Sequence, residues 1–324
     1  MLIQDVFSAY KDDLQRVEKC INDNVNSEIK LIPEIAHHLI DSGGKRFRPL
    51  LLLLCSRLCG YQGESRFPMA TVMEFIHTAT LLHDDVIDQA LIRRGKDSAN
   101  KIFGNSVSIL VGDFLCFKAF MLMSGIGNND IFGLVSQMGN IMSEGEVFQL
   151  TKCGDVNITE NEYLSIIEKK TAVLISASCA AGAILGDAPR EKIDALKRFG
   201  RNVGMAFQIT DDVLDYMAKG EEFGKSIGKD LEEGKITLPL IFAIRDSPEE
   251  EKNTIREIIT LKKGSQKAAR EIIKLIKKYK AIDSSLQVAA GYISEAKSQL
   301  SIFNDCSEKD HLNTVAEYIL FRNV

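Results

Sequence analysis

The amino-acid sequence predicts an all-α protein that folds as a single domain over residues 1–324. Leucine, isoleucine and valine recur at helical spacing along the whole chain, whereas the alternating pattern of a β-strand hardly appears. Six prolines in 324 residues leave most helix interiors uninterrupted. Hydrophobic residues make up 45% of the chain and charged residues 26%, which is enough apolar material for one large helical bundle.

Short clusters of glycine, asparagine, aspartate and proline divide the chain into its helical segments. These turn clusters are residues 41–44, 125–130, 186–189, 220–234 and 246–248. None is long enough to be a domain linker. The densest apolar run, at 49–55, is far shorter than the roughly 20 residues that a membrane-spanning helix needs. We therefore expect no transmembrane segment, and any membrane contact would be peripheral.

Two segments toward the C-terminal end show helical stripes. One buried face consists of Leu312, Val315, Ala316, Ile319 and Leu320. The other segment, at 262–280, is basic and amphipathic, so its apolar side faces either an ordinary core or a membrane surface.

Composition also restricts the partners and the compartment. The formal net charge is −5, so the sequence offers no basic surface for nucleic acid. The seven cysteines fall at irregular spacings without a CxxC pair, which is typical of reduced thiols. The first 20 residues carry acidic side chains and lack the features of a signal peptide. We expect a cytoplasmic protein.

Two aspartate-rich motifs are the strongest chemical signal. "HDDVID" at 83–88 and "TDDVLD" at 210–215 each follow an apolar helical segment. Asp84 and Asp88 project from one helix face, with His77 nearby, and carboxylates at this spacing repel each other. A divalent cation would remove the repulsion, and oxygen ligands favour Mg²⁺ over zinc. The alternative is that an aspartate run marks a helix end or a solvated turn.

Magnesium held by few carboxylates usually also binds substrate phosphates. Arginine grips phosphate oxygens in a bidentate fashion and lysine supplies a compact charge. The basic residues available for this are Lys45, Arg46, Arg48, Arg93, Arg94, Lys169, Lys170, Lys225, Lys229 and Lys235. The sequence therefore predicts a substrate that carries a diphosphate.

Five motifs resemble, in the same order, those of the trans-isoprenyl (polyprenyl) diphosphate synthases. They are "GGKRFRP" at 43–49, "HDDVID" at 83–88, "RRGK" at 93–96, "KKTA" at 169–172 and "FQITDDVLD" at 207–215. The resemblance covers about residues 40–240. It implies a helical bundle around a central cavity, a homodimer, and head-to-tail addition of isopentenyl diphosphate to an allylic diphosphate with three Mg²⁺ ions.

The resemblance also implies a role for each matched residue. Isopentenyl diphosphate would be bound by Lys45, Arg48, His77 and Arg94. The allylic diphosphate would be bound by Arg93, Lys170, Thr171, Gln208, Lys225 and Lys235, with Thr171 and Gln208 beside the carbocation. Asp84, Asp88, Asp211 and Asp215 would hold the metals, supported by Asp85 and Asp212.

Product length is also addressed by the resemblance. In this family a bulky aromatic residue just before the first aspartate motif closes the product tunnel, whereas this chain has Ala79 and Thr80 there. The tunnel would continue toward Leu115, Ala119, Leu122 and Met123. We expect an octaprenyl-type synthase that extends farnesyl diphosphate for quinone side chains. The alternative is a shorter geranylgeranyl or farnesyl product, because Phe120 or Met123 would shorten the tunnel.

Other classes of protein share parts of this pattern. The pairs Glu34–His37 and Glu74–His77 have the ligand spacing of di-iron bundles, but that class does not account for the aspartate motifs. "HD" at 83–84 also occurs in metal phosphohydrolases, whose other histidines are not evident. Class I terpene cyclases share the first aspartate motif but not the second. A non-catalytic partner subunit would be expected to lose motif aspartates.

Three residues near the motifs have two interpretations each. Arg46 is either a solvated surface residue or a substrate contact. Arg322 either folds over the isopentenyl diphosphate site or belongs to a frayed terminus. His83 is interpreted as a packing residue beside the metals rather than a ligand.

Overall fold

The computed structural model describes residues 1–217, 229–261 and 266–321, and it confirms the all-α fold. The chain forms two compact units, each of which is described by itself. Unit 1 comprises Met1–Gln137, Leu174–Lys197 and Ile302–Val315. Unit 2 comprises Met138–Val173, Arg198–Ser301 and Ala316–Val324. The single domain over residues 1–324 stays a prediction.

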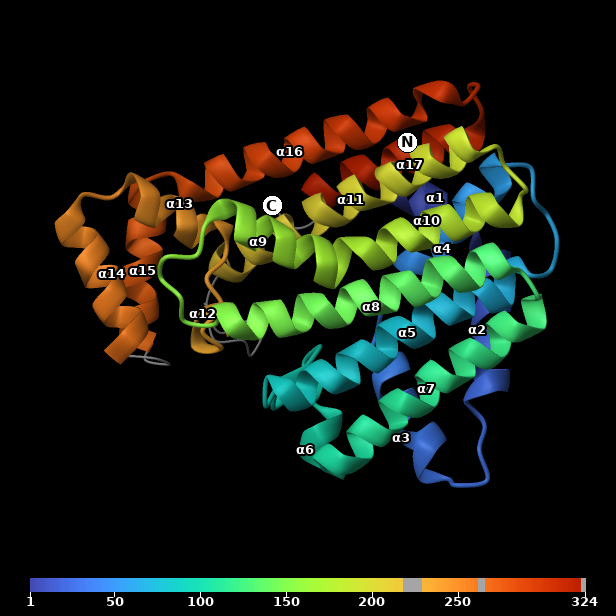
Figure 1. The fold of residues 1–324 in the computed structure, drawn as a ribbon, viewed down its shortest axis with the longest axis horizontal. Coiled ribbons are helices and arrows are strands. Elements are labelled where there is room, and N and C mark those ends of the chain that lie inside the picture. Colours follow the sequence, from blue (N-terminus) through green and yellow to red (C-terminus); the bar gives the residue numbers. More distant parts are fainter. Residues whose placement is uncertain (218–228, 262–265, 322–324) are drawn as a thin grey trace. The chain divides into compact units, whose positions relative to one another are not determined.

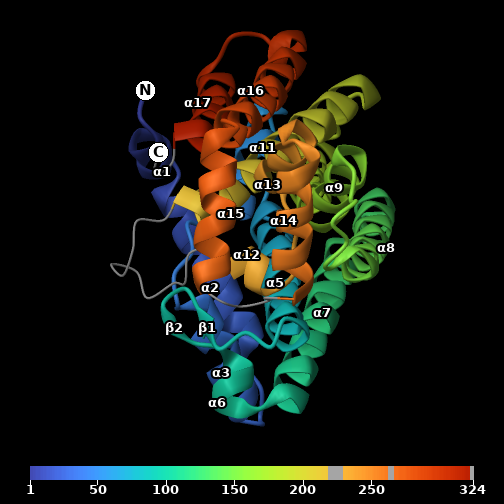
Figure 2. The same ribbon diagram turned by 90° about the vertical axis from the view of Figure 1, so that its left-hand side faces the viewer.

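The α-helices are labelled in Figure 1 and the two strands in Figure 2. Unit 1 contains α1 (Ile3–Ala9), α2 (Lys11–Val25), α3 (Leu31–Ile40), α4 (Phe47–Leu58), α5 (Arg66–Ile87), β1 (Ile92–Arg93), β2 (Lys96–Asp97), α6 (Ala99–Phe103) and α7 (Asn105–Ile126). Unit 2 contains α9 (Glu160–Ile167), η1 (Glu168–Ala172), α12 (Lys229–Glu232), α13 (Leu238–Asp246), α14 (Glu249–Leu261), α15 (Gln266–Lys278) and α16 (Ala281–Gln299). The unit boundaries fall within or beside α8 (Asn129–Lys152), α10 (Val173–Leu185), α11 (Arg190–Met217), η2 (Leu300–Ile302) and α17 (Ser307–Phe321).

The core of unit 1 is built around α4. The five leucines 50–54 are all fully buried, as expected for a helix that is apolar on every side. Gly182 of α10 lets that helix approach closely, because a Cβ atom at this position would lie 2.5 Å from the carbonyl oxygen of Leu52. The close approach removes the polar backbone of α4 from water and fixes its place in the core.

Helices α5 and α7 lie side by side in unit 1 (Figure 1). Gly112 of α7 makes room for the ring of His83, since a Cβ atom there would lie 2.3 Å from His83 Nε2. The same His83 nitrogen lies 3.1 Å from the carbonyl oxygen of Ile109 and 3.4 Å from Asp113 Oδ1. The end of α5 that carries the first aspartate motif is therefore braced against α7, in agreement with a packing role for His83.

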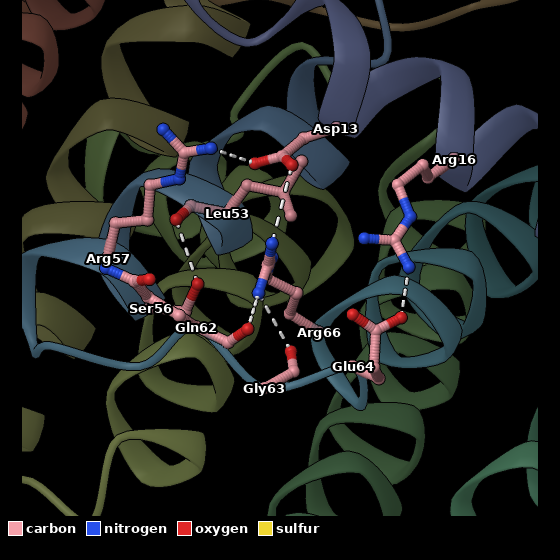
Figure 3. Close-up of polar contacts among 9 residues, drawn as sticks. All are labelled: Asp13, Arg16, Leu53, Ser56, Arg57, Gln62, Gly63, Glu64 and Arg66. Atoms are coloured by element: carbon pink, nitrogen blue, oxygen red, sulfur yellow. Dashed lines mark hydrogen bonds and ion pairs between the residues drawn. The ribbon is translucent and has the colours of Figure 1, made fainter.

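A buried ion-pair cluster connects α2 with α4 and α5 (Figure 3). Asp13 Oδ2 accepts a 2.6 Å hydrogen bond from Arg57, and Asp13 Oδ1 lies 3.5 Å from the guanidinium of Arg66. The side chains of Asp13 and Arg66 are only 8% and 9% exposed. Arg66 also donates to the backbone carbonyl oxygens of Gln62 and Gly63. We call these three charged residues, Asp13, Arg57 and Arg66, the Asp13 cluster.

A small hairpin after α5 was not predicted. Strands β1 and β2 pair Ile92 with Asp97 and Arg93 with Lys96 (Figure 2). Arg94 and Gly95 between them have φ angles of 52° and 77°, as the two-residue turn of such a hairpin requires. The turn holds the "RRGK" motif in a fixed geometry.

Helix α7 presents an apolar surface. The most apolar 18-residue stretch of this 22-residue helix has a mean hydropathy of 1.8, and only 28% of that stretch is buried in the structure. Leu110, Phe117 and Met121 are 64%, 65% and 66% exposed. Among the described residues it is the one helix long and apolar enough to cross a membrane, which the sequence analysis missed. Length and apolar composition alone do not distinguish such a span from a protein interface.

Unit 2 is organised around a π-helical turn, η1, which carries Lys169, Lys170 and Thr171. Two glycines pack against it. A Cβ atom at Gly204 of α11 would lie 2.5 Å from Ala172 Cα, and one at Gly145 of α8 would lie 2.7 Å from Lys169 Cβ. Single π-turns within helices often mark functional sites. Here the turn lies between two helices that leave room only for glycine.

Within the basic segment predicted at 262–280, the described residues Gln266–Lys278 form α15, which lies beside α14 (Figure 2). Ile272 and Ile276 are fully buried, so this apolar side faces the core of unit 2. At the end of the helix, Lys278 and Tyr279 donate to the carboxylate of Glu251 on α14, with a Tyr279 Oη to Glu251 Oε2 distance of 2.8 Å. The core interpretation of this helix is therefore confirmed.

Candidate functional site

The first aspartate motif lies at the C-terminal end of α5 in unit 1. Asp84 and Asp88 are half-buried, one turn apart, whereas Asp85 is fully buried. Asp85 Oδ1 accepts hydrogen bonds from two guanidinium nitrogens of Arg93, with an Arg93 Nε distance of 2.8 Å. The backbone carbonyl of Asp85 accepts a 3.0 Å hydrogen bond from Asn100. The middle aspartate thus ties the hairpin to α5, while the two outer carboxylates remain at the surface of unit 1.

Burial disfavours the charged form of Arg93, but the hydrogen bond and the charge of Asp85 raise the pKa of Arg93 above its usual value. Arg93 therefore keeps its charge even though its side chain is only 25% exposed. A guanidinium fixed in this way lies directly beside the motif that would bind metal-complexed diphosphate.

The residues expected to bind isopentenyl diphosphate gather in unit 1. Burial lowers the pKa of His77, and the charges of Arg48 and Arg94 lower it further. His77 is therefore neutral at pH 7 and able to accept or donate a hydrogen bond. Gly44 lies against Arg94, because a Cβ atom at Gly44 would be 3.2 Å from the guanidinium of Arg94. Lys45, beside it, is exposed.

Of the two interpretations of Arg46, the structure contradicts the solvated surface residue. It has a left-handed φ of 46° and caps α4, and its side chain is only 10% exposed. Its guanidinium lies 2.5 Å from Glu18 and 3.1 Å from Glu74 and donates to the carbonyl oxygen of Ile40. The local pattern does not distinguish the two interpretations because the partners of Arg46 come from distant segments.

These contacts also argue against the di-iron alternative. The carboxylate of Glu74 accepts a hydrogen bond from Arg46, and His37 Nδ1 lies 3.4 Å from Asp41 on the surface. Among the residues that the structure describes, no three histidine, cysteine or acidic side chains are arranged as a metal site. A di-iron centre needs such a set on four helices.

The expected tunnel residues lie on α5 and α7. Ala79, Leu115 and Ala119 are fully buried in unit 1 and Met123 is 2% exposed. Thr80 is half-buried and its hydroxyl donates to the carbonyl oxygen of His77 at 2.8 Å. The small side chain of Ala79 lies within the packed region that α5 and α7 share.

Unit 2 contains a pocket of about 110 Å³ that collects residues from two of the motifs together with Lys235. It is lined by Gln149, Lys152, Cys153, Ile158, Tyr163, Ile166, Ile167, Lys170, Thr171, Gln208, Asp212, Asp230, Lys235, Ile236 and Thr237. "KKTA", "FQITDDVLD" and Lys235 are far apart in the sequence. Their convergence on one pocket matches the expectation that they act together on one substrate.

A chain of hydrogen bonds crosses this pocket. Thr171 Oγ1 donates to Gln208 Oε1 at 2.9 Å, and Gln208 Nε2 donates to Asp212 Oδ1 at 2.7 Å. Tyr163 Oη donates to the other oxygen, Asp212 Oδ2, at 2.6 Å. Asp212 therefore accepts hydrogen bonds on both oxygens, whereas Asp211 is exposed and Asp215 is half-buried.

Two carboxyl groups of the pocket have raised pKa values. Burial raises the pKa of Asp212 to about 7; the hydrogen bonds from Tyr163 and Gln208 oppose this rise, and the charges of Asp211 and Asp215 add to it. Burial, together with the charge of Asp212, also raises the pKa of Asp230 well above its ordinary value. A bound cation would reverse this tendency, since it favours the ionised carboxylate.

Two lysines of the pocket each contact a carboxylate. Lys170 Nζ lies 2.8 Å from Glu146 Oε2, and Lys235 Nζ lies 2.6 Å from Glu233 Oε2. A diphosphate that entered the pocket would compete with these carboxylates for the two ammonium groups. Lys225, which was also expected to bind the allylic diphosphate, and Arg322 lie outside the described residues.

The donor set fits the expected metal. The two aspartate motifs offer carboxylate oxygens, and Mg²⁺ binds through one or two carboxylates together with phosphate oxygens and water. Asp84, Asp88, Asp211 and Asp215 have partly or fully accessible side chains within their own units, as ligands to an incoming metal–diphosphate complex must.

Several residues of the site were missed by the sequence analysis. Glu74 and Tyr163 are buried and Asp230 is half-buried next to predicted residues, yet none belongs to a quoted motif. Glu74 had a signal, its position one helical turn before His77, which was interpreted as metal-ligand spacing. Tyr163 looks like any apolar-face residue of a short helix, so the local sequence gives no signal for it.

Comparison with known proteins agrees with the motifs. The sequence model of a family described as polyprenyl synthetase matches residues 29–276. An octaprenyl diphosphate synthase from Escherichia coli (strain K12) is 41% identical over 259 residues, which cover 80% of each chain. An octaprenyl diphosphate synthase from Haemophilus influenzae is 36% identical over 323 residues, which cover 100% of this chain and 98% of that protein.

The fold has solved counterparts. A polyprenyl synthase from Caulobacter crescentus CB15, solved in complex with calcium and isoprenyl diphosphate, matches with a TM-score of 0.95 and 38% identity. The match covers 99% of this chain and 98% of that chain. Other matched relatives are named for products that range from geranylgeranyl to nonaprenyl diphosphate.

Proposed function

This chain belongs to the polyprenyl synthetase family and is a trans-prenyl diphosphate synthase, and from this premise we propose that it makes a long-chain, octaprenyl-type product. The substrates of the family are isopentenyl diphosphate and an allylic diphosphate, and we propose farnesyl diphosphate as the primer. The expected use of the product is the side chain of a quinone. The two octaprenyl diphosphate synthases with high identity support this length.

The observation that carries the proposal is the pocket of unit 2. The same cavity is lined by residues of two motifs and by Lys235; the motif residues are Lys170, Thr171, Gln208 and Asp212. Two ammonium groups, an amide and a hydroxyl beside buried carboxylates suit a diphosphate leaving group whose departure creates a carbocation. Apolar residues on the other walls, including Ile166 and Ile236, limit the access of water to that cation.

We assign roles to the side chains as follows. Lys170 and Lys235 bind the diphosphate of the allylic substrate together with Arg93, and they stabilise its charge as the allylic C–O bond breaks. The hydroxyl of Thr171 and the carbonyl oxygen of Gln208 lie beside the resulting carbocation. Lys45, Arg48, His77 and Arg94 hold isopentenyl diphosphate, whose double bond attacks that cation. A proton then leaves to the departing pyrophosphate, so no protein nucleophile is needed.

We propose that Asp84, Asp88, Asp211 and Asp215 hold three Mg²⁺ ions when the allylic diphosphate binds. The metal supplies Lewis-acid stabilisation of the leaving diphosphate. Replacing Asp84 or Asp211 by Asn should therefore abolish prenyl transfer and retain the fold. The exposed Asp130 offers a control, because Asp130→Asn should leave turnover unchanged.

The central test is a product-length assay. The protein is incubated with farnesyl diphosphate, labelled isopentenyl diphosphate and Mg²⁺, and the dephosphorylated products are separated by reversed-phase thin-layer chromatography. We expect octaprenyl alcohol as the main product. A main product of geranylgeranyl length or shorter contradicts the proposed length, whereas an absence of any Mg²⁺-dependent prenyl transfer contradicts the proposed function.

Ala79 offers a sharper test of the length proposal. A phenylalanine in its place should block the space between α5 and α7 and shorten the product without abolishing turnover. Ala289 in α16 is also fully buried, so Ala289→Phe controls for the strain of overpacking a core position. Product of unchanged length from the Ala79 variant would exclude this residue from the tunnel.

We also propose that the protein is a homodimer and that α7 contributes to the interface. Leu110, Phe117 and Met121 are exposed on this helix, and Phe120 and Phe132 are 42% and 46% exposed in the same unit. Exposed apolar surface of this kind usually marks a protein or membrane contact. Light scattering should give twice the chain mass for the wild type, and Phe117→Glu should give a monomer. A wild-type monomer would refute the proposal.

A further inference from the structure

We propose that Tyr163, a residue outside the family motifs, positions the catalytic groups of the pocket by fixing Asp212 and, through it, Gln208 and Thr171. This inference rests on the proposed function of the same pocket. Its basis is the chain of three hydrogen bonds that begins at the Tyr163 hydroxyl and ends at Thr171.

The carboxylate of Asp212 lies between Tyr163 and Gln208. One of its oxygens accepts a hydrogen bond from Tyr163 and the other accepts one from Gln208. Tyr163 and Asp212 are 3% and 5% exposed, so solvent does not supply replacement donors readily. Because both oxygens are engaged, the side chain of Asp212 has one orientation in the pocket.

The side-chain amide of Gln208 is oriented by Asp212. Because its NH₂ group donates to Asp212, its carbonyl oxygen points the other way and accepts a hydrogen bond from the hydroxyl of Thr171. The amide orientation is thus determined by Asp212. The Thr171 hydroxyl directs its hydrogen toward Gln208, which leaves its oxygen lone pairs to face a developing positive charge. A change at Asp212 would rotate or loosen both of these groups.

Tyr163 is itself held in place by the start of α9. Helix α9 begins with a capping box in which Thr159 and Glu162 bond to each other's backbone amides. Glu162, next to Tyr163, also forms a 2.7 Å ion pair with Lys152 of α8. The tyrosine therefore projects from the first turn of α9, which the capping box and the ion pair both hold in place. Precise placement of groups around the reacting atoms is worth large factors in rate.

The test is Tyr163→Phe, which keeps the ring and removes only the hydroxyl. We expect kcat to fall about tenfold, the effect of roughly one net hydrogen bond lost in the transition state, while KM for isopentenyl diphosphate stays unchanged. The matched control is Tyr279→Phe, which removes a tyrosine–carboxylate hydrogen bond of 2.8 Å in the same unit, away from the pocket. This control should retain the wild-type kcat.

A double-mutant cycle separates positioning from a merely structural role. If Tyr163 acts through Gln208, Tyr163→Phe should lower kcat in the wild type but have little further effect in a Gln208→Ala background. An equal fall in both backgrounds, or no fall in the wild type, would overturn the inference. Absence of prenyl transfer by the wild-type protein would refute the proposed function and with it this inference.

A second variant covers the case in which Tyr163→Phe fails to fold, as judged by its thermal transition. Asp212→Asn interrupts the same chain of hydrogen bonds at its centre. It should lower kcat and leave KM for isopentenyl diphosphate unchanged, and an unchanged kcat would overturn the inference.

Discussion

Replacing Asp13 by Ala should destabilise unit 1 by several kcal/mol, because it leaves two guanidinium groups of the Asp13 cluster without their counter-charge. The side chain of Arg66 is 9% exposed and would keep the carbonyl oxygens of Gln62 and Gly63 and the ring of Phe67 as partners, none of which carries a negative charge. Removing one partner of a buried ion pair destabilises by about 3–5 kcal/mol. Arg57 is 33% exposed and can recover part of its hydration, so we expect the lower half of that range.

Figure 3 also contains the control for this prediction. Arg16 and Glu64 form an ion pair whose side chains are 50% and 73% exposed. An exposed pair contributes only about 0–1 kcal/mol, so Glu64→Ala should hardly change stability. Both substitutions remove one carboxylate that pairs with arginine, and they differ chiefly in burial.

The assay is equilibrium unfolding in urea followed by far-ultraviolet circular dichroism. Asp13→Ala should move the unfolding midpoint clearly to lower urea, and Asp13→Asn, which keeps the shape and one acceptor oxygen, should move it less. If the two units unfold separately, only one transition should shift. Equal midpoints for Asp13→Ala and Glu64→Ala would refute the reasoning that burial gives this cluster its strength.

Three further predictions follow from the two units. Gly204→Ala should destabilise by about 1–3 kcal/mol, since its Cβ would lie 2.5 Å from Ala172 Cα, whereas Gly291→Ala in α16, with open space around it, should not destabilise; thermal melting distinguishes them. Burial raises the pKa of Asp212 to about 7, so the free energy of unfolding of the metal-free protein should fall as the pH rises from about 4 to 7. Asp212→Asn should remove this contribution to the pH dependence of stability. The same pH dependence in the wild type and the variant would contradict the prediction. Arg46→Ala removes the guanidinium that pairs with the buried carboxylate of Glu74, and that carboxylate would then act more strongly on the nearby Arg94. KM for isopentenyl diphosphate should therefore rise while KM for the allylic substrate stays constant. The control Arg16→Ala should change neither KM.

Local patterns were sufficient for most of the fold. Leu312 to Leu320 and the stripe of α15 were predicted from their spacing, because the 3.6-residue period of a buried helix face is a local property. The hairpin at Ile92–Asp97 escaped prediction, since strands of two residues are too short to show a period. The π-turn at Glu168–Ala172 has no sequence period either, and its glycine neighbours come from other helices.

Residues whose role depends on distant partners could not be predicted from the sequence. Arg46 turns inward because Glu18 and Glu74 lie on other helices, and the adjacent sequence suggests only a basic cluster. Tyr163 is recognised as part of the pocket only because Asp212, far along the chain, accepts its hydrogen bond. The family resemblance supplied the motif residues, whereas the residues that hold them in place came from the structure.

The π-turn at Glu168–Ala172 makes the length of this stretch of chain critical. A wider turn accommodates an additional residue, and each residue of an α-helix advances the side-chain direction by about 100°. Deleting a single residue here would let the chain relax into regular helix with the later positions roughly in place, but the side chains of the turn itself, including Lys170 and Thr171, would move away from their present directions. A conservative replacement of Lys169 is therefore expected to be far better tolerated than its removal.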